Sequence, residues 1–100
     1  MAINFNLEWD PKKARANQTA HGVGFDEGAT VFTDPMALSI FDPDHSEMEE
    51  RWITMGISGK GRLLVVMHTF RKEDEDAITI RIISTRKASK RESQTYGERS

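Results

Sequence analysis

The sequence contains no cysteine and no hydrophobic run that could cross a membrane. Without cysteine, the chain has no disulfide, no thiolate nucleophile and no cysteine-based zinc site. Its longest apolar run, from Leu63 to Met67, has the length of a strand, far below the ~20 residues of a transmembrane helix. The N-terminal residues also lack the basic and apolar regions of a secretory signal. We therefore expect a cytoplasmic protein with no membrane partner.

The length and composition indicate one globular domain. The chain has 100 residues, of which 37% are hydrophobic and 30% charged, so we expect a single domain over residues 1–100 with a frayed tail at 97–100. The net charge of −2 argues at first against a nucleic-acid partner. The charges are uneven, however. Residues 42–50 and 73–76 are acidic, whereas residues 12–15 and 81–91 are basic, so a basic face remains possible if the fold brings the last two segments together.

The N-terminal third predicts a strand and two helices. Residues 3–7 alternate between apolar and polar, which is typical of a half-buried strand. Asp10 and Pro11 are the residue types that begin a helix, and Gly22 suits its end, so the first helix spans residues 11–21. A shorter helix is expected over residues 25–32.

The remaining chain predicts sheet followed by a last helix. Apolar and β-branched runs indicate strands over residues 37–41, 51–57, 62–70 and 78–83. A hairpin turn is expected at residues 58–61, and the acidic residues 73–76 form another turn. Ser84 or Thr85 then caps a helix over residues 86–96. The predicted fold is α+β, with two N-terminal helices, an antiparallel sheet of three to four strands and a C-terminal helix.

Two groups of polar residues are candidates for chemistry. On the first helix, Lys13, Asn17 and His21 are spaced by four, which places an ammonium, an amide and an imidazole on one polar face. In the strand over residues 78–83, Arg81 is a full charge among isoleucines, which is costly unless the arginine is paired or reaches water. Either it bridges to an acid such as Glu50, Glu92 or Asp26, or its planar fork faces a phosphate.

Other residues add to these candidates without deciding their role. Arg51 and Arg71 stand at a strand start and a strand end, where side chains can point into a shared cleft. The last helix carries Tyr96, a packing residue with its hydroxyl at the edge, and a basic face that is either solvated or follows a nucleic-acid backbone. That basic face consists of Lys87, Lys90 and Arg91. His68 shares the parity of the apolar residues of its strand and is expected to be a packed or an edge histidine.

A metal site is not expected. Asp42, Asp44, His45 and Glu47 lie close in sequence, but they lack the spacing and the glycine of an EF-hand. The sequence also contains no Gly-rich phosphate loop, nucleophile elbow or HExxH motif. We therefore expect no metal and no cofactor.

Three ordered sets of residues resemble the BrnT family of toxins and together cover nearly the whole chain. The first set comprises residues 7–14 (LEWDPKKA), Asn17, residues 21–23 (HGV), Phe25 and residues 31–35 (VFTDP). The second comprises residues 50–53 (ERWI), Gly56 and residues 61–66 (GRLLVV). The third comprises residues 81–88 (RIISTRKA), Glu92 and Tyr96.

The resemblance implies a type II toxin with a RelE-like fold, a metal-independent endoribonuclease that cleaves RNA and inhibits translation. It also implies a BrnA-type antitoxin with a ribbon-helix-helix domain, a heterotetrameric complex, and contact with DNA only through that antitoxin. In such an enzyme, the residues that would act on the phosphate and the transferred protons are Arg51, Arg71, Arg81, Arg86, His21 and Tyr96. The residues that would bind RNA are Lys13, Lys87, Lys90 and Arg91.

A second hypothesis is a catalytically weak or inactive binding module that acts with a DNA-binding antitoxin as co-repressor. The acidic residues 42–50 support it, as does Ala20, which replaces the lysine usual in the family before His21. The two hypotheses differ in whether RNA is cleaved and whether substitution of the arginines matters.

Overall fold

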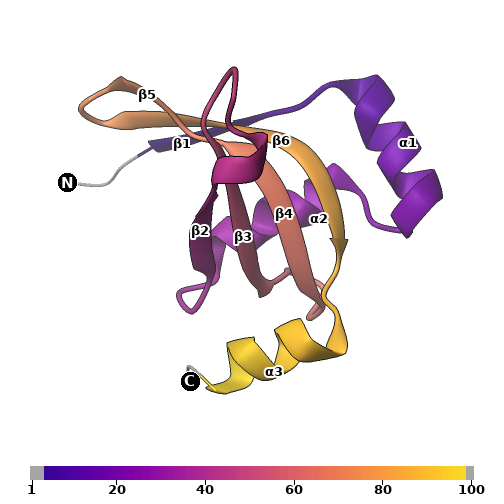
Figure 1. Ribbon diagram of the computed structural model, residues 1–100. Coiled ribbons are helices and arrows are strands. Elements are labelled where there is room, and N and C mark those ends of the chain that lie inside the picture. The colour runs from indigo at the N-terminus through magenta and orange to yellow at the C-terminus, as the bar shows by residue number, and fades with distance from the viewer. Residues whose placement is uncertain (1–3, 99–100) are drawn as a thin grey trace.

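The computed structural model describes residues 4–98 and contains three α-helices and six strands (Figure 1). The helices are α1 (Pro11–His21), α2 (Phe25–Ala29) and α3 (Lys90–Glu98), and short 3₁₀ turns cover Thr30–Thr33 and Pro43–His45. The strands are β1 (Asn4–Glu8), β2 (Leu38–Asp42), β3 (Arg51–Ile57), β4 (Leu63–Thr69), β5 (Arg71–Asp74) and β6 (Ala77–Lys87). No helix in this part of the chain is long and apolar enough to span a membrane.

The strands form one mixed sheet in the order β1-β6-β4-β3-β2, with β5 also paired to β6. Only the pairing of β1 with β6 is parallel, while the other pairs are antiparallel. Figure 1 shows α2 behind the sheet, α1 at its side and α3 across the bottom, with β1, β5 and the start of β6 extending to the upper left. The α+β class is therefore confirmed.

Helix α1 begins and ends as the sequence predicts. The side chain of Asp10 accepts a hydrogen bond from the backbone N–H of Lys12 at 2.8 Å, and Pro11 occupies the first turn. Gly22 adopts the left-handed conformation with φ of 68°, and its N–H donates to the carbonyl of Gln18 at 2.9 Å. These contacts define where α1 begins and where it ends.

The core lies between the sheet and the layer of α1 and α2. The fully buried side chains that pack together there are Val23, Phe25, Val31, Leu64, Val66 and Ile82. His68 belongs to the same side of β4; it is fully buried, and its Nε2 lies 2.6 Å from the hydroxyl of Thr54. Burial lowers the pKa of His68 to about 4, so the imidazole is neutral near neutral pH. Of the two predicted alternatives, a packed or an edge histidine, the structure has the packed one.

The end of the chain corrects the predicted last helix. Residues 86 and 87 belong to β6, which continues to Lys87, and α3 begins only at Lys90. The cap is Ser89, not Ser84 or Thr85: its hydroxyl accepts from the N–H of Glu92 at 3.1 Å, and its own N–H donates to the Glu92 carboxylate at 2.8 Å. The helix also includes residues 97 and 98, which we expected to be frayed, whereas residues 99–100 lie outside the described part.

The sheet has more strands than predicted. Instead of three to four antiparallel strands, the described residues form six, because β1 joins β6 in parallel and the acidic turn near Glu75 is flanked by the short strand β5. The predicted helix over residues 25–32 is α2 followed by a 3₁₀ turn. The first strand is described from Asn4 onward, so the predicted start at Ile3 lies outside the described residues.

Candidate functional site

Three of the predicted arginines lie on the sheet face that α1 and α2 do not cover. In β4, Leu64 and Val66 face the core, so Val65 and Thr69 face the opposite side. Arg86 pairs with Val65, and Arg51 pairs with Thr69. Both arginines therefore project from this opposite side, which we call the open face.

Arg81 reaches the open face because β6 contains a bulge. Met67 pairs with Ser84 and His68 with Ile82, so Ile83 has no opposite residue in β4. Arg81 and Arg86 are five positions apart and would point to opposite faces of a regular strand. The extra residue shifts the alternation by one, and both guanidinium groups lie on the open face.

The first arginine group surrounds Glu49 at one end of the open face. The carboxylate of Glu49 accepts a hydrogen bond from the guanidinium of Arg81 and lies 3.9 Å from that of Arg51. Arg71, on β5, pairs with the carboxylates of Glu73 at 2.8 Å and Glu8 at 4.0 Å. A cleft of about 180 Å³ joins these elements; it is lined by Glu49, Glu50, Thr69, Phe70, Arg71 and Arg81.

The second arginine group lies where β6 leads into α3. Arg86 donates two hydrogen bonds to Glu92, at 2.8 and 2.9 Å. The hydrogen bonds from Arg86 lower the pKa of the Glu92 carboxyl to about 2, which keeps it ionised. Tyr96, one turn further along α3, donates its hydroxyl proton to Asp34 at an O–O distance of 2.6 Å. Tyr96 belongs to α3 and Arg86 lies just before it. Both are therefore placed where α3 covers the lower end of the open face.

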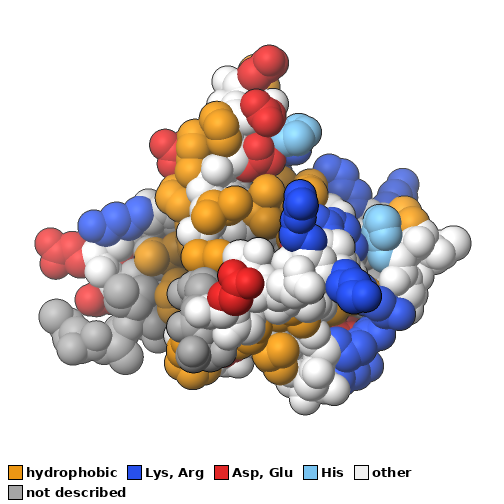
Figure 2. Space-filling model, turned by 60° about the horizontal axis from the view of Figure 1, so that its bottom comes forward, with side chains coloured by type: hydrophobic (Ala, Val, Ile, Leu, Met, Phe, Trp, Pro, Cys, Tyr) orange, Lys and Arg blue, Asp and Glu red, His pale blue; other side chains and the backbone are white. Residues whose placement is uncertain are grey.

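An apolar stretch separates the two arginine groups. A pocket of about 180 Å³ between the sheet and α3 is lined by Leu38, Ile40, Ile53, Met55, Val65, Glu92 and Thr95. Ile40, on the edge strand β2, is 53% exposed. Figure 2 shows hydrophobic side chains gathered at the centre of this side, most of the Lys and Arg to the right, and Asp and Glu mainly at the top and left.

Other predicted residues lie away from this face. His21 and Lys13 are exposed on α1, in the layer that covers the other side of the sheet, and do not join the arginines. Asn17 corrects the predicted polar face of α1: it is only 8% exposed, and its amide nitrogen donates to the carbonyls of Val23 at 2.9 Å and Thr85 at 2.7 Å. It fastens α1 to β6 and does not face solvent.

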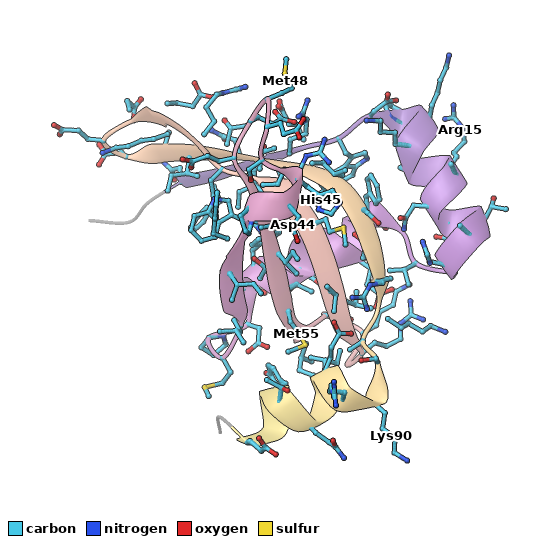
Figure 3. The ribbon with its side chains drawn as sticks, viewed as in Figure 1. Arg15, Asp44, His45, Met48, Met55 and Lys90 are labelled. Atoms are coloured by element: carbon cyan, nitrogen blue, oxygen red, sulfur yellow. The ribbon has the colours of Figure 1, made fainter. Side chains whose placement is uncertain are left out.

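The remaining basic residues are exposed around the start of α3. Lys87 ends β6, and Lys90 and Arg91 occupy the first turn of α3, where Lys90 points away from the sheet (Figure 3). Within the acidic segment 42–50, the imidazole of His45 lies 2.8 Å from the Asp42 carboxylate. Across residues 4–98, no group of three or more ligating side chains is placed to hold a metal ion.

Sequence reasoning missed two features of the site. It named Glu50, Glu92 or Asp26 as the acid that pairs with Arg81, whereas the acid is Glu49. The run of glutamates directly before β3 was the only signal for this pairing. It also missed that the Nε atom of Arg51 is buried and has no hydrogen-bond partner among the described residues, although the side chain as a whole is 37% exposed. Its Nε is covered by the protein, so a ligand would reach this guanidinium through the exposed part of the side chain.

Comparisons with known proteins define the class of this protein. Residues 9–92 match the family described as "Ribonuclease toxin, BrnT, of type II toxin-antitoxin system". The fold is similar to the crystal structure of the Brucella abortus ribonuclease toxin BrnT, with a TM-score of 0.54 and 20% identity over 87% of this chain and 100% of that one. No curated protein matches the sequence. The class is that of ribonuclease toxins of type II toxin-antitoxin systems. Within it, the chain belongs to the BrnT family.

Proposed function

We propose that this protein is an active endoribonuclease whose open face binds RNA and whose cleavage of RNA inhibits translation. The observation that carries the proposal is that Arg51, Arg81 and Arg86 lie on one face, which Arg81 and Arg86 share because of the β6 bulge. Arginine on a face that α1 and α2 leave uncovered is suited to phosphate, because its planar fork donates two hydrogen bonds at once.

The proposed chemistry needs cations at the phosphate and groups that move two protons. Cleavage by the neighbouring 2′-hydroxyl requires a base for that hydroxyl and an acid for the departing 5′-oxygen, while the crowded phosphate gains negative charge. Arg81 and its neighbour Arg51 would stabilise that charge, with Arg71 lining the same cleft as Arg81. Arg86, beyond the apolar stretch, would bind another phosphate of the same strand. Tyr96, on α3, is the proton-transfer candidate on this side of the sheet, and its hydroxyl donates to Asp34. The predicted roles of His21 as acid or base, and of Lys13 in RNA binding, remain predictions.

The family supplies the rest of the proposal. A type II toxin has an antitoxin; we propose a BrnA-type partner with a ribbon-helix-helix domain, which dimerises and so favours a heterotetramer. DNA would be contacted only through that antitoxin. We further propose a RelE-like fold, metal-independent cleavage in the cytoplasm, and contacts with RNA through Lys87, Lys90 and Arg91.

The test is cleavage of RNA by the purified chain in the presence of a chelator. We expect the wild-type protein to degrade single-stranded RNA and its expression to arrest growth, and Arg81→Ala to relieve both. Arg15→Ala removes an exposed arginine from α1 and is the matched control, expected to leave cleavage unchanged. Intact RNA after incubation with folded wild-type protein would overturn the proposal.

One observation favours the second candidate, a weak or inactive binding module. Arg81, Arg71 and Arg86 are each already paired with a carboxylate of this chain. If these pairs persisted in the complex, the arginines would serve structure and RNA would not be bound. That candidate predicts a tight complex with the antitoxin, no cleavage, and no functional loss when Arg81 is replaced.

A further inference from the structure

One carboxylate in the cleft beside Arg71 and Arg81 has no partner among the residues that the structure describes. The carboxylate of Glu49 accepts a hydrogen bond from Arg81 and lies near Arg51. Its neighbour Glu50 lines the same cleft, yet within residues 4–98 it makes no hydrogen bond or ion pair. Neither the arrangement of the fold nor the proposed phosphate chemistry uses this side chain.

An ionised carboxylate in an RNA-binding cleft restricts what can lie against it. It only accepts hydrogen bonds, and it repels the phosphates that the neighbouring arginines attract. The part of RNA that faces Glu50 must therefore be an uncharged group that donates hydrogen bonds. In single-stranded RNA, those groups are the sugar hydroxyls and the Watson–Crick edges of unstacked bases.

Among the four bases, guanine alone presents two adjacent donors on its Watson–Crick edge, N1–H and the N2 amino group. Adenine and cytosine each present one amino donor beside a ring acceptor, and uracil presents one N–H between two carbonyls. A carboxylate has two oxygens that accept two parallel hydrogen bonds, the same geometry by which it pairs with an arginine fork. The group that Glu50 fits best is guanine.

The other walls of the cleft suit the rest of a guanine nucleotide. Thr69 brings a hydroxyl, which can donate to the O6 carbonyl beside N1–H, and Phe70 adds an apolar surface to the lining. Arg71 and Arg81 supply donors for the attached phosphate. Base and phosphate would thus be held by different sets of residues in one cleft.

We propose that Glu50 is a specificity-determining residue that binds the Watson–Crick edge of a guanine next to the scissile phosphate. The inference rests on the proposed ribonuclease function and adds to it a preference for RNA that contains guanine. Discrimination by a bidentate contact of this kind corresponds to about tenfold or more between guanine and a base that lacks the two donors.

The test uses three RNA oligonucleotides that contain only cytidine and uridine except at one central position, which is guanosine, inosine or adenosine. Inosine keeps N1–H and lacks the amino group, so it offers one of the two donors. We expect the wild-type rate of cleavage at that position to decrease in the order guanosine, inosine, adenosine. Glu50→Gln should lower cleavage at guanosine to the level at adenosine. Glu47→Gln, from the same acidic segment, should keep the wild-type order.

Two other results would overturn the inference. An equal loss with all three oligonucleotides in Glu50→Gln would assign Glu50 to the chemical step and not to base recognition. An unchanged order in Glu50→Gln would leave Glu50 without a role in recognition. Fluorescence anisotropy with the same labelled oligonucleotides separates this inference from the proposed function. If the wild-type protein cleaves none of them but still binds guanosine at least tenfold more tightly than adenosine, and Glu50→Gln abolishes that difference, only the ribonuclease proposal fails.

Discussion

Arg86 and Glu92 are joined by two parallel hydrogen bonds, at 2.8 and 2.9 Å, across the boundary between β6 and α3. The same carboxylate accepts from the N–H of Ser89, so it caps the helix and holds the arginine at once. In this arrangement, carboxylate oxygens occupy the positions on the arginine fork that phosphate oxygens would take. RNA that binds Arg86 must therefore compete with Glu92.

The first prediction concerns this competition. Glu92→Gln keeps an acceptor at the helix cap but removes the charge that holds Arg86. We expect RNA to bind more tightly, by a few-fold, and the free energy of unfolding to fall by about 1 kcal/mol, because the pair is partly solvated. Binding is measured by anisotropy and stability by urea unfolding. Glu98→Gln, at the exposed end of α3, is the control; weaker RNA binding by Glu92→Gln would show that the pair positions Arg86 for RNA.

The second prediction concerns the layer that holds α1. The Asn17 side chain bridges α1, the loop after it and β6, and its loss leaves buried backbone carbonyls at Val23 and Thr85 without their donor. We expect Asn17→Ala to lower the free energy of unfolding by about 2–3 kcal/mol. Gln18→Ala, one position along on the exposed side, should change it by less than about 0.5 kcal/mol. Equal effects of the two substitutions would mean that the amide does not hold the layers together.

The third prediction is a pH dependence of stability caused by His68. Its pKa is about 4 in the folded protein against an ordinary value of 6.5, so between these values the unfolded chain binds more protons. The contribution of His68 to stability is therefore complete above about pH 6.5, decreases as the pH falls, and is lost by about pH 4. The difference corresponds to about 3 kcal/mol.

Urea unfolding between pH 4 and 8 measures this effect. The variant His68→Gln should lack the decrease between pH 6.5 and 4, whereas His45→Gln, which alters an exposed histidine, should retain it. A decrease of the same size in His68→Gln would assign the effect to other groups. Loss of stability at still lower pH is expected in all variants, because Glu27 and Glu92 have pKa values of about 2.

The fourth prediction separates the open face from the helix layer. Arg51→Ala removes a guanidinium from the open face, and we expect RNA cleavage to fall by roughly 100-fold with the fold unchanged. Arg51→Lys should recover only part of this activity, because lysine lacks the planar fork. Arg15→Ala alters the opposite layer and should change the rate by less than about twofold. Initial rates of cleavage, with circular dichroism as the check on folding, give the comparison; a loss for Arg15→Ala as large as that for Arg51→Ala would contradict the assignment of the open face.

The local parts of the fold follow from short sequence signals, and the parts that depend on distant pairings do not. Asp10, Pro11 and Gly22 determine α1 through contacts within a few residues, so its ends were predictable. The end of β6 was not, because Arg86 and Lys87 are residues that favour helix, and pairing with Val65 and Leu64 overrides that preference. The parallel pairing of β1 with β6 is likewise a long-range outcome.

The candidate site was predictable in its residue types but not in its grouping. A lone arginine in a strand of isoleucines indicated Arg81 directly, and the basic segment that follows indicated Arg86. Which acid pairs with Arg81 depends on the path of residues 42–50 over the sheet, and no local pattern encodes that path. The amide of Asn17 looked like part of a polar surface because spacing along α1 gives no information about the direction in which the sheet lies.

The unpaired Ile83 has a consequence for how this strand can vary in length. A deletion or insertion of one residue between Arg81 and Arg86 would leave both arginines in the sequence and still move one of them to the buried side of the sheet. The geometry of the open face therefore requires Arg81 and Arg86 to be five positions apart, whatever side chain stands at position 83. A homologous chain that keeps both arginines but has a gap at this point would retain the composition of the open face without its geometry.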